Sequence, residues 1–191
     1  MIDDAFDDLM GMLDYPVFVV TTVADGEPAG CLVSLASQTS VHPPSFVISL
    51  TLNSHTAEVA GRSEFLAVHM LPRRQQALAE LFGTKTGREV NKFERCSWRP
   101  GPQGMPILDE TVAWFVARTV SRSDVGDHVV YLLAPIAGWA PESEEDLLYL
   151  SDLEFDVDDD DGGHEDPQRL YVRERGDARR YNVPRFTLDV P

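Results

Sequence analysis

The sequence predicts a mainly β protein in which antiparallel strands close into a small barrel with short helices at its periphery. Short runs of β-branched and aromatic residues alternate with Gly, Pro and Asp turn signals, as is typical of antiparallel sheets. No Gly-x-Gly-x-x-Gly pattern follows a strand, so a Rossmann nucleotide-binding fold is not indicated. The chain has 191 residues, of which 43% are hydrophobic. It is therefore long enough for one domain with a substantial core.

The strand signals are spread along most of the chain. Asp25-Gly26 is a hairpin-type turn signal, and Pro43-Pro44 interrupts the chain before another apolar run. Residues 84–106 are polar and rich in turn residues, which indicates a long loop. Residues 111–120 and 128–138 then form a long hairpin. Strands are accordingly predicted at 17–23, 30–35, 45–50, 64–71, 111–120, 128–138 and, as a final edge strand, 147–150.

Three stretches predict short helices. Residues 3–13 place apolar side chains on one face and aspartates near the N-terminus. Residues 53–60 begin with Asn53 or Ser54 as the N-cap. Residues 73–82 are rich in good helix formers and are expected to end at Gly83.

The charge of the chain is uneven. The formal net charge is −16, yet thirteen acidic residues and no Lys or Arg lie between Glu142 and Asp166, which leaves −16 + 13 = −3 for the rest. We therefore expect a domain over residues 1–153 and an acidic, then basic, extension over residues 154–191, partly disordered or packed back on the barrel. No basic stripe marks a nucleic-acid interface, so no nucleic-acid partner is expected.

Several other classes of protein are not indicated by the sequence. The acidic N-terminus has the wrong sign for a signal peptide, and no apolar run is long enough to span a membrane. A cytoplasmic protein without a membrane partner is therefore expected. Cys31 and Cys96 lack the spacing of a zinc site, and no pair of histidines has metal-ligand spacing, so no metal is predicted.

Gly126-Asp127-His128 lies at the turn of the predicted long hairpin. Gly and Asp suit a tight turn, so an ordinary polar turn is one interpretation. A turn does not require a histidine, however. His128 can change its charge near neutral pH, and the neighbouring carboxylate of Asp127 can fix its tautomer. The alternative interpretation is therefore a functional site.

Hydroxyl side chains are dense between Ser34 and Thr56, with nine Ser or Thr in 23 residues. One interpretation is structural: Thr favours strands, Ser favours turns, and hydroxyl side chains on strands can simply face water. The other is an anion site, because Ser54 and Thr56 lie at a predicted helix start where free backbone N–H groups favour a phosphate. Lys92 or Arg62 would add positive charge there.

Taken in order, these pieces resemble the short-chain flavin reductases of the FMN-binding split-barrel superfamily over about residues 8 to 153. The chain departs from the family pattern at Leu32, His69 and Asn91. The stretches that carry the resemblance are 15–22 with Gly30 and Ser34, 40–44 with 49–56, 65–71 with 78–82 and 91–93, and 106–109 through Trp114 to Gly126-Asp127-His128.

The resemblance implies a Greek-key split β-barrel and a set of site residues. The flavin ring is expected against the backbone of Val33-Ser34-Leu35, and the FMN phosphate near Asn53, Ser54 and Thr56. Gly126, Asp127 and His128 would contact the nicotinamide, with Asp127 and His128 as the catalytic pair. The remaining cofactor-binding residues that the resemblance implies are Ser49, Leu50, Lys92 and Phe93.

The function that the resemblance implies is an NAD(P)H-dependent flavin reductase. NAD(P)H would donate hydride to FMN, with FAD or riboflavin as alternative acceptors, and a homodimer would complete each site. Reduced flavin would then reach a monooxygenase partner or oxygen. The alternatives are a flavin carrier or sensor without turnover, and a related split-barrel oxidase. For the extension, a solvated spacer and a segment packed over the site or the dimer partner both remain open.

Overall fold

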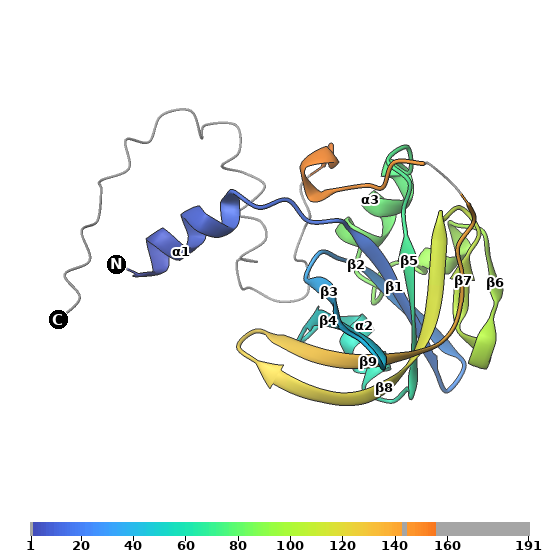
Figure 1. The fold of residues 1–191 in the computed structure, drawn as a ribbon. Helices are drawn as coiled ribbons and strands as arrows, with labels where there is room; N and C mark the ends of the chain where they lie inside the picture. The colour runs from blue at the N-terminus through green and yellow to red at the C-terminus, as the bar shows by residue number, and fades with distance from the viewer. Residues whose placement is uncertain (1, 143–144, 156–191) are drawn as a thin grey trace.

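The computed structural model describes residues 2–142 and 145–155 of the chain (Figure 1). Apart from Glu154 and Phe155, the predicted C-terminal extension lies outside these described residues. The predicted mainly β, antiparallel architecture is confirmed, because seven strands form one sheet in the order β2-β1-β5-β8-β9-β4-β3. They are β1 (Phe18–Ala24), β2 (Glu27–Val33), β3 (Ala36–Val41), β4 (Pro44–Thr51), β5 (Phe65–Met70), β8 (Ala113–Val125) and β9 (His128–Trp139).

Two hairpin turns have the backbone conformations that their residues predict. Asp25 and Gly26, between β1 and β2, have φ values of 52° and 79°, as a I′ turn requires. Gly126, the first central residue between β8 and β9, has a φ of 62°, which a II′ turn requires. Both turn predictions are therefore confirmed. Strand β8 continues to Val125, beyond the predicted end at residue 120, although its distal residues are exposed on both faces.

Three strand predictions were incomplete or wrong. Strand β3 was not predicted, because it is a mostly exposed strand at the sheet edge without apolar alternation. The predicted loop at 84–106 contains a small sheet, in which β6 (Trp98–Pro100) pairs with β7 (Pro106–Leu108). The predicted edge strand at 147–150 makes only isolated bridges, Pro16↔Tyr149 and Pro72↔Leu147.

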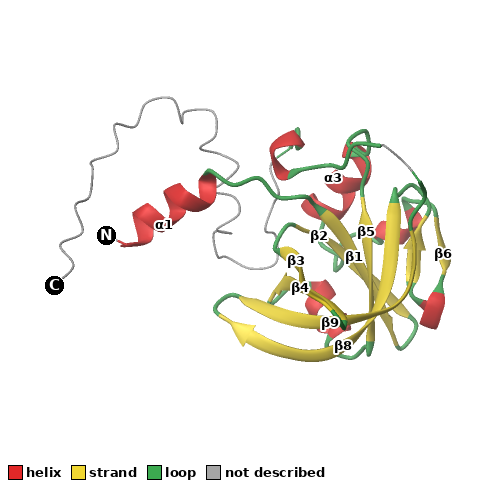
Figure 2. Ribbon diagram, in the orientation of Figure 1, coloured by secondary structure: helices red, strands yellow, loops and turns green. Residues whose placement is uncertain are grey.

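The described residues also form the helices α1, α2 and α3 (Figure 2). Helix α2 (His55–Ala60) follows β4 directly, whereas α1 (Ile2–Gly11) extends away from the barrel. Helix α3 (Gln76–Thr84) passes through Gly83 instead of ending there. The physical reason is packing: a Cβ at Gly83 would lie 3.0 Å from Cδ2 of Leu32, so glycine permits the helix to approach β2 closely.

The core consists of two main apolar clusters on opposite faces of β1. Phe18 and Val20 belong to the cluster inside the barrel, whereas Val17 and Val19 pack in the cluster beneath α3. This alternation follows from the two-residue side-chain period of a strand. Strand β1 therefore connects the barrel to its helical cover.

His69 on β5 is fully buried and links three strands. Its Nδ1 lies 2.9 Å from the carbonyl oxygen of Val19 on β1, and its Nε2 accepts a hydrogen bond from the Leu108 N–H on β7 at 3.2 Å. Nδ1 therefore carries the proton and donates to Val19, so the ring is neutral. Burial lowers the pKa of His69 from its ordinary value of 6.5 to about 4, because desolvation disfavours the imidazolium.

The buried neutral ring of His69 predicts a specific loss of stability in acid. Between pH 6.5 and 4 the unfolded chain binds a proton at residue 69 that the folded protein does not. This contribution to stability is therefore complete above pH 6.5 and falls by about 3 kcal/mol as the pH decreases to 4. The measurement is urea unfolding across this range for the wild type and for His69→Asn, which does not titrate.

The free energy difference between the wild type and His69→Asn should shift by that amount over the pH range. His42→Gln, at an exposed histidine, should retain the wild-type pH profile. A constant difference between the wild type and His69→Asn would show that the buried ring does not couple stability to pH.

Candidate functional site

The C-terminal end of β4 brings together segments that are far apart in sequence. Thr51 pairs with His128 at the start of β9, and the Leu52 N–H donates to the Asp127 carbonyl oxygen at 2.9 Å. Further along β4, the Ser49 N–H donates to the carbonyl oxygen of Leu35 at 2.9 Å. The predicted ring-binding segment and the Gly-Asp-His turn thus both contact this one strand.

Side chains along this end of β4 alternate between the core and the outer face of the sheet. Ile48 and Leu50 are buried, so Ser49 and Thr51 face the other way. Directly opposed residues of an antiparallel pair share a face. His128, the partner of Thr51, therefore lies on the same outer face as the two hydroxyl residues.

Asp127 orients the ring of His128. The Asp127 Oδ1 lies 2.6 Å from His128 Nδ1, and the histidine side chain is 12% exposed against 52% for the aspartate. A carboxylate at this distance accepts a hydrogen bond from Nδ1–H, and in that tautomer of the neutral ring Nε2 is an acceptor. The structure thus gives the pair a defined tautomer at a turn that a polar loop alone would not require.

Ser54 caps helix α2, as the sequence predicts. Its Oγ accepts a hydrogen bond from the Ala57 N–H at 3.1 Å, and the Glu58 N–H reaches the Ser54 carbonyl oxygen at 3.1 Å. The first turn of a helix leaves backbone N–H groups without intrahelical acceptors. The start of α2 is therefore the place where a phosphate was predicted, although the Thr56 residue itself is buried.

Arg88 is a cation at this helix start that the sequence did not single out. Its Nη2 donates to the Asn53 carbonyl oxygen at 2.9 Å and to the Glu58 Oε1 at 2.6 Å. The preceding residue, Gly87, lies so close to His55 that an added Cβ would be 2.4 Å from its Cδ2. The 85–91 segment therefore lies against the start of α2, beside the turn that Asp127 contacts.

The two cations predicted at the phosphate have other partners. The Lys92 Nζ is buried and donates to the carbonyl oxygens of Gly30 and Phe82 at 3.1 and 3.2 Å. Arg62 pairs with Asp25 and Glu27 at the β1–β2 turn, at 2.8 and 2.6 Å. The contacts described for the helix start thus include Arg88 rather than Arg62, and a flavin contact of Lys92 remains a prediction.

Other predicted cofactor residues are part of the core. Val33 and Leu50 belong to the barrel cluster, and Ser34 is also buried. Phe93 packs edge-on against Phe82 and Trp98, with ring centroids 5.7 and 5.6 Å away. For Val33 and Leu50 a cofactor can therefore meet only the backbone, whereas Leu35 is 38% exposed and presents its side chain.

No group of three or more His, Cys, Asp or Glu side chains that could hold a metal occurs among residues 2–142 and 145–155. Desolvation raises the pKa of Cys96 to about 11, and Glu110 and Asp109 add to the shift. The same described residues include no helix both long and apolar enough to cross a membrane.

This arrangement of barrel, β4 end and hairpin turn belongs to a known family. Residues 10–154 match the family described as flavin reductase like domain, and the chain belongs to that family. It is 31% identical over 149 residues to the FMN reductase (NADH) RutF of Ancylobacter novellus, covering 78% of this chain and 81% of the relative. It is 32% identical over 151 residues to the flavin reductase (NADH) of Kitasatospora aureofaciens, with 76% and 77% covered.

Solved structures share the fold. Component B of nitrilotriacetate monooxygenase from Mycobacterium thermoresistibile superposes with a TM-score of 0.69 and 29% identity, over 78% of this chain and 82% of that one. A flavin reductase domain protein from Arthrobacter sp. FB24 gives a TM-score of 0.71 at 22% identity, over 79% and 92%. The predicted split-barrel fold is therefore confirmed.

Proposed function

We propose that this protein is an NAD(P)H-dependent flavin reductase whose flavin lies along the outer face of β4. The observation that carries the proposal is that Leu35, Asp127 and Arg88, from three separate segments, all contact β4 or the turn that follows it. Family membership supports it, since the relatives that match over three quarters of the chain are named as NADH-dependent flavin reductases.

The residues at the end of β4 fit FMN. The phosphate would meet the N–H groups at the start of α2 together with Arg88, and the hydroxyls of Ser49 and Thr51 suit the ribityl chain. The backbone at Val33-Ser34-Leu35 would support the ring. The bound flavin supplies the hydride-accepting chemistry, and FAD or riboflavin is the alternative acceptor.

Asp127 and His128 act on the nicotinamide in this proposal. The Asp127 Oδ1 lies 2.6 Å from His128 Nδ1 and accepts a hydrogen bond from it, so Nε2 would face the ligand in one tautomer. A fixed ring can accept a hydrogen bond from the nicotinamide carboxamide and thereby set the approach of the donor carbon. The protein contributes positioning and exclusion of water rather than a covalent step.

The test is transient NAD(P)H oxidation by the FMN-loaded full chain under nitrogen. His128→Ala should lower kcat/KM for the dinucleotide on the order of a hundredfold, because a misplaced donor loses reactive geometry. The flavin affinity should change little, since the helix start remains intact. His42→Ala, at an exposed histidine before the start of β4 and so at the opposite end of that strand from Thr51 and His128, should match the wild type.

Two outcomes separate the rival functions. A protein that binds FMN but consumes no NAD(P)H, even with excess flavin, is a carrier or sensor. Turnover that is unchanged in His128→Ala would remove the proposed role of this residue while leaving a reductase.

A comparison of the affinities for FMN and for riboflavin tests the proposed position of the FMN phosphate. Arg88→Gln should weaken FMN binding about tenfold and leave riboflavin binding nearly unchanged, because only FMN carries the phosphate. Ser54→Asp should act the same way, since aspartate preserves the N-cap but places a negative charge at the helix start. Flavin fluorescence quenching measures both affinities.

Ser54→Ala is the matched control for the cap. It should lower the free energy of unfolding by about 1 kcal/mol without a charge effect on FMN. Equal losses for FMN and riboflavin in Arg88→Gln would place the phosphate elsewhere.

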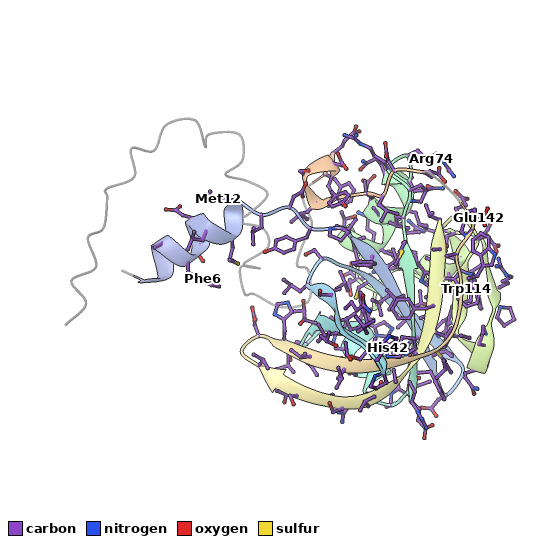
Figure 3. All side chains as sticks on the ribbon, viewed as in Figure 1. Phe6, Met12, His42, Arg74, Trp114 and Glu142 are labelled. Atoms are coloured by element: carbon purple, nitrogen blue, oxygen red, sulfur yellow. The ribbon has the colours of Figure 1, made fainter. Side chains whose placement is uncertain are left out.

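We also infer a homodimer that supplies reduced flavin to a monooxygenase. Apolar side chains of α1 and of the residue after it are uncovered, with Phe6, Leu9 and Met12 exposed by 54, 57 and 80%, and Figure 3 shows Phe6 and Met12 away from the barrel. Apolar groups on such a helix favour burial against a second copy. Relatives named as monooxygenase reductase components support the partner.

Sedimentation velocity tests the dimer. The wild type should sediment as two chains, and Leu9→Asp with Met12→Asp should shift the protein toward the monomer, because burial of two charges opposes association. Glu80→Lys, an exposed change on α3, serves as the control. A wild type that remains monomeric at micromolar concentration would exclude the inferred assembly.

A further inference from the structure

A second cavity lies away from the proposed flavin site. It has a volume of about 410 Å³. The end of α2 and the segment between α2 and β5 form one wall, and β8 together with Tyr131 of β9 forms the other. Ligand pockets commonly occupy about 300–1,000 Å³. The cavity is thus large enough for a small organic molecule.

The cavity and the proposed flavin site occupy different parts of the fold. Ala60 and Gly61 border the cavity, whereas Ser54 and Arg88 lie at the opposite end of α2, about 9 Å along a six-residue helix. Tyr131 pairs with Ile48 and points into the core side of the sheet. His128 and Thr51 lie on the other face.

A β-bulge shapes the wall of this cavity. Thr119 pairs with Leu133 and Ser121 pairs with Leu132, which leaves Val120 as an extra residue in β8. Val120 is 60% exposed. A bulge redirects the neighbouring side chains, and residues on both sides of Val120 consequently line the same cavity.

Arg122 is held at the cavity wall. Its Nη1 donates to the Gly61 carbonyl oxygen at 3.1 Å, and Tyr131 lies beside it on the same cavity lining. An added Cβ at Gly61 would lie 3.0 Å from this Nη1, so glycine makes room for the guanidinium. The neutral carbonyl oxygen of Gly61 positions Arg122 without cancelling its charge, and the carboxylates near this wall are Glu64 and Asp124.

Arg118 and Arg122 have no carboxylate partners among the described residues. Glu64 also lines the cavity, yet no ion pair joins it to either guanidinium. By contrast, five other arginines of this part of the chain pair with Asp or Glu: Arg62, Arg73, Arg74, Arg88 and Arg99. Two guanidiniums without an ion pair thus line one cavity, where Glu64 is the carboxylate, in a chain with a formal charge of −16.

We propose that this cavity binds the phosphoryl group of a small phosphate ester. Two guanidiniums match the oxygens of a phosphate, to which each can donate two hydrogen bonds. The Ser121 hydroxyl adds a donor from the same wall. The volume exceeds that of a phosphate, so the ester part of the ligand also fits.

Site-resolved titration tests the proposal. The full chain is labelled with ¹⁵N and titrated separately with ribose 5-phosphate, inorganic phosphate and ribose at low ionic strength. Ribose 5-phosphate should shift the amide signals of Gly61 and Ser121 in a saturable way. Arg118→Gln should weaken this binding about tenfold, and it should fold normally because no described interaction of the Arg118 side chain is lost.

Arg95→Gln is the matched control, because it also removes one exposed guanidinium but does not line the cavity, so it should bind ribose 5-phosphate as the wild type does. Saturable shifts with inorganic phosphate would show that the phosphoryl group alone is recognised, which supports the proposal. The proposal is overturned if Gly61 and Ser121 do not respond, if ribose alone produces the same shifts, or if Arg118→Gln binds as tightly as the wild type.

Discussion

The pairing of β4 with β9 is the constraint on which the candidate site depends. It sets Thr51 opposite His128 and Ile48 opposite Tyr131, so alternate residues face either the core or the outer surface. A slip of one residue would move each side chain of β9 to the other face. The buried Leu50, Val129 and Leu133 therefore fix the position of His128 as firmly as any contact of the histidine itself.

The same constraint extends to the loops. Because β4 ends beside the start of β9, the short turn after β4 contacts two distant segments. Its Leu52 N–H donates to the Asp127 carbonyl oxygen, and its Asn53 carbonyl oxygen accepts from Arg88. Loops position functional side chains well when a rigid sheet anchors them. Here the two-residue turn at Gly126-Asp127 leaves the backbone little conformational freedom. The φ of 62° at Gly126 suits the twist of strands β8 and β9.

The features that could be predicted from the sequence are those set by neighbouring residues, and the features that were missed depend on contacts between distant segments. Ser54, the Asp25-Gly26 turn and the Gly126-Asp127-His128 turn carry their signals within a few residues, and each lies as predicted. Arg88 could not be found this way, because its place beside Asn53 arises only from folding of the 84–106 segment. Strand β3 was missed for a related reason: an exposed strand at the sheet edge needs no apolar alternation, so its pairing with β4 left no pattern to read.

The distribution of charge explains how an acidic chain can receive anionic ligands. FMN and NAD(P)H both carry phosphates, and the formal charge of −16 opposes their approach. Salt screens exposed charges beyond about 8 Å at physiological ionic strength, however, so the net charge of the chain acts only weakly over a distance. The potential at each site is therefore set mainly by the nearest groups. At the start of α2 these groups are Arg88 and Glu58, which form an ion pair while Arg88 also donates to the Asn53 carbonyl oxygen. At the cavity they are Arg118, Arg122 and Glu64, and the carbonyl oxygen of Gly61 positions Arg122 without neutralising it.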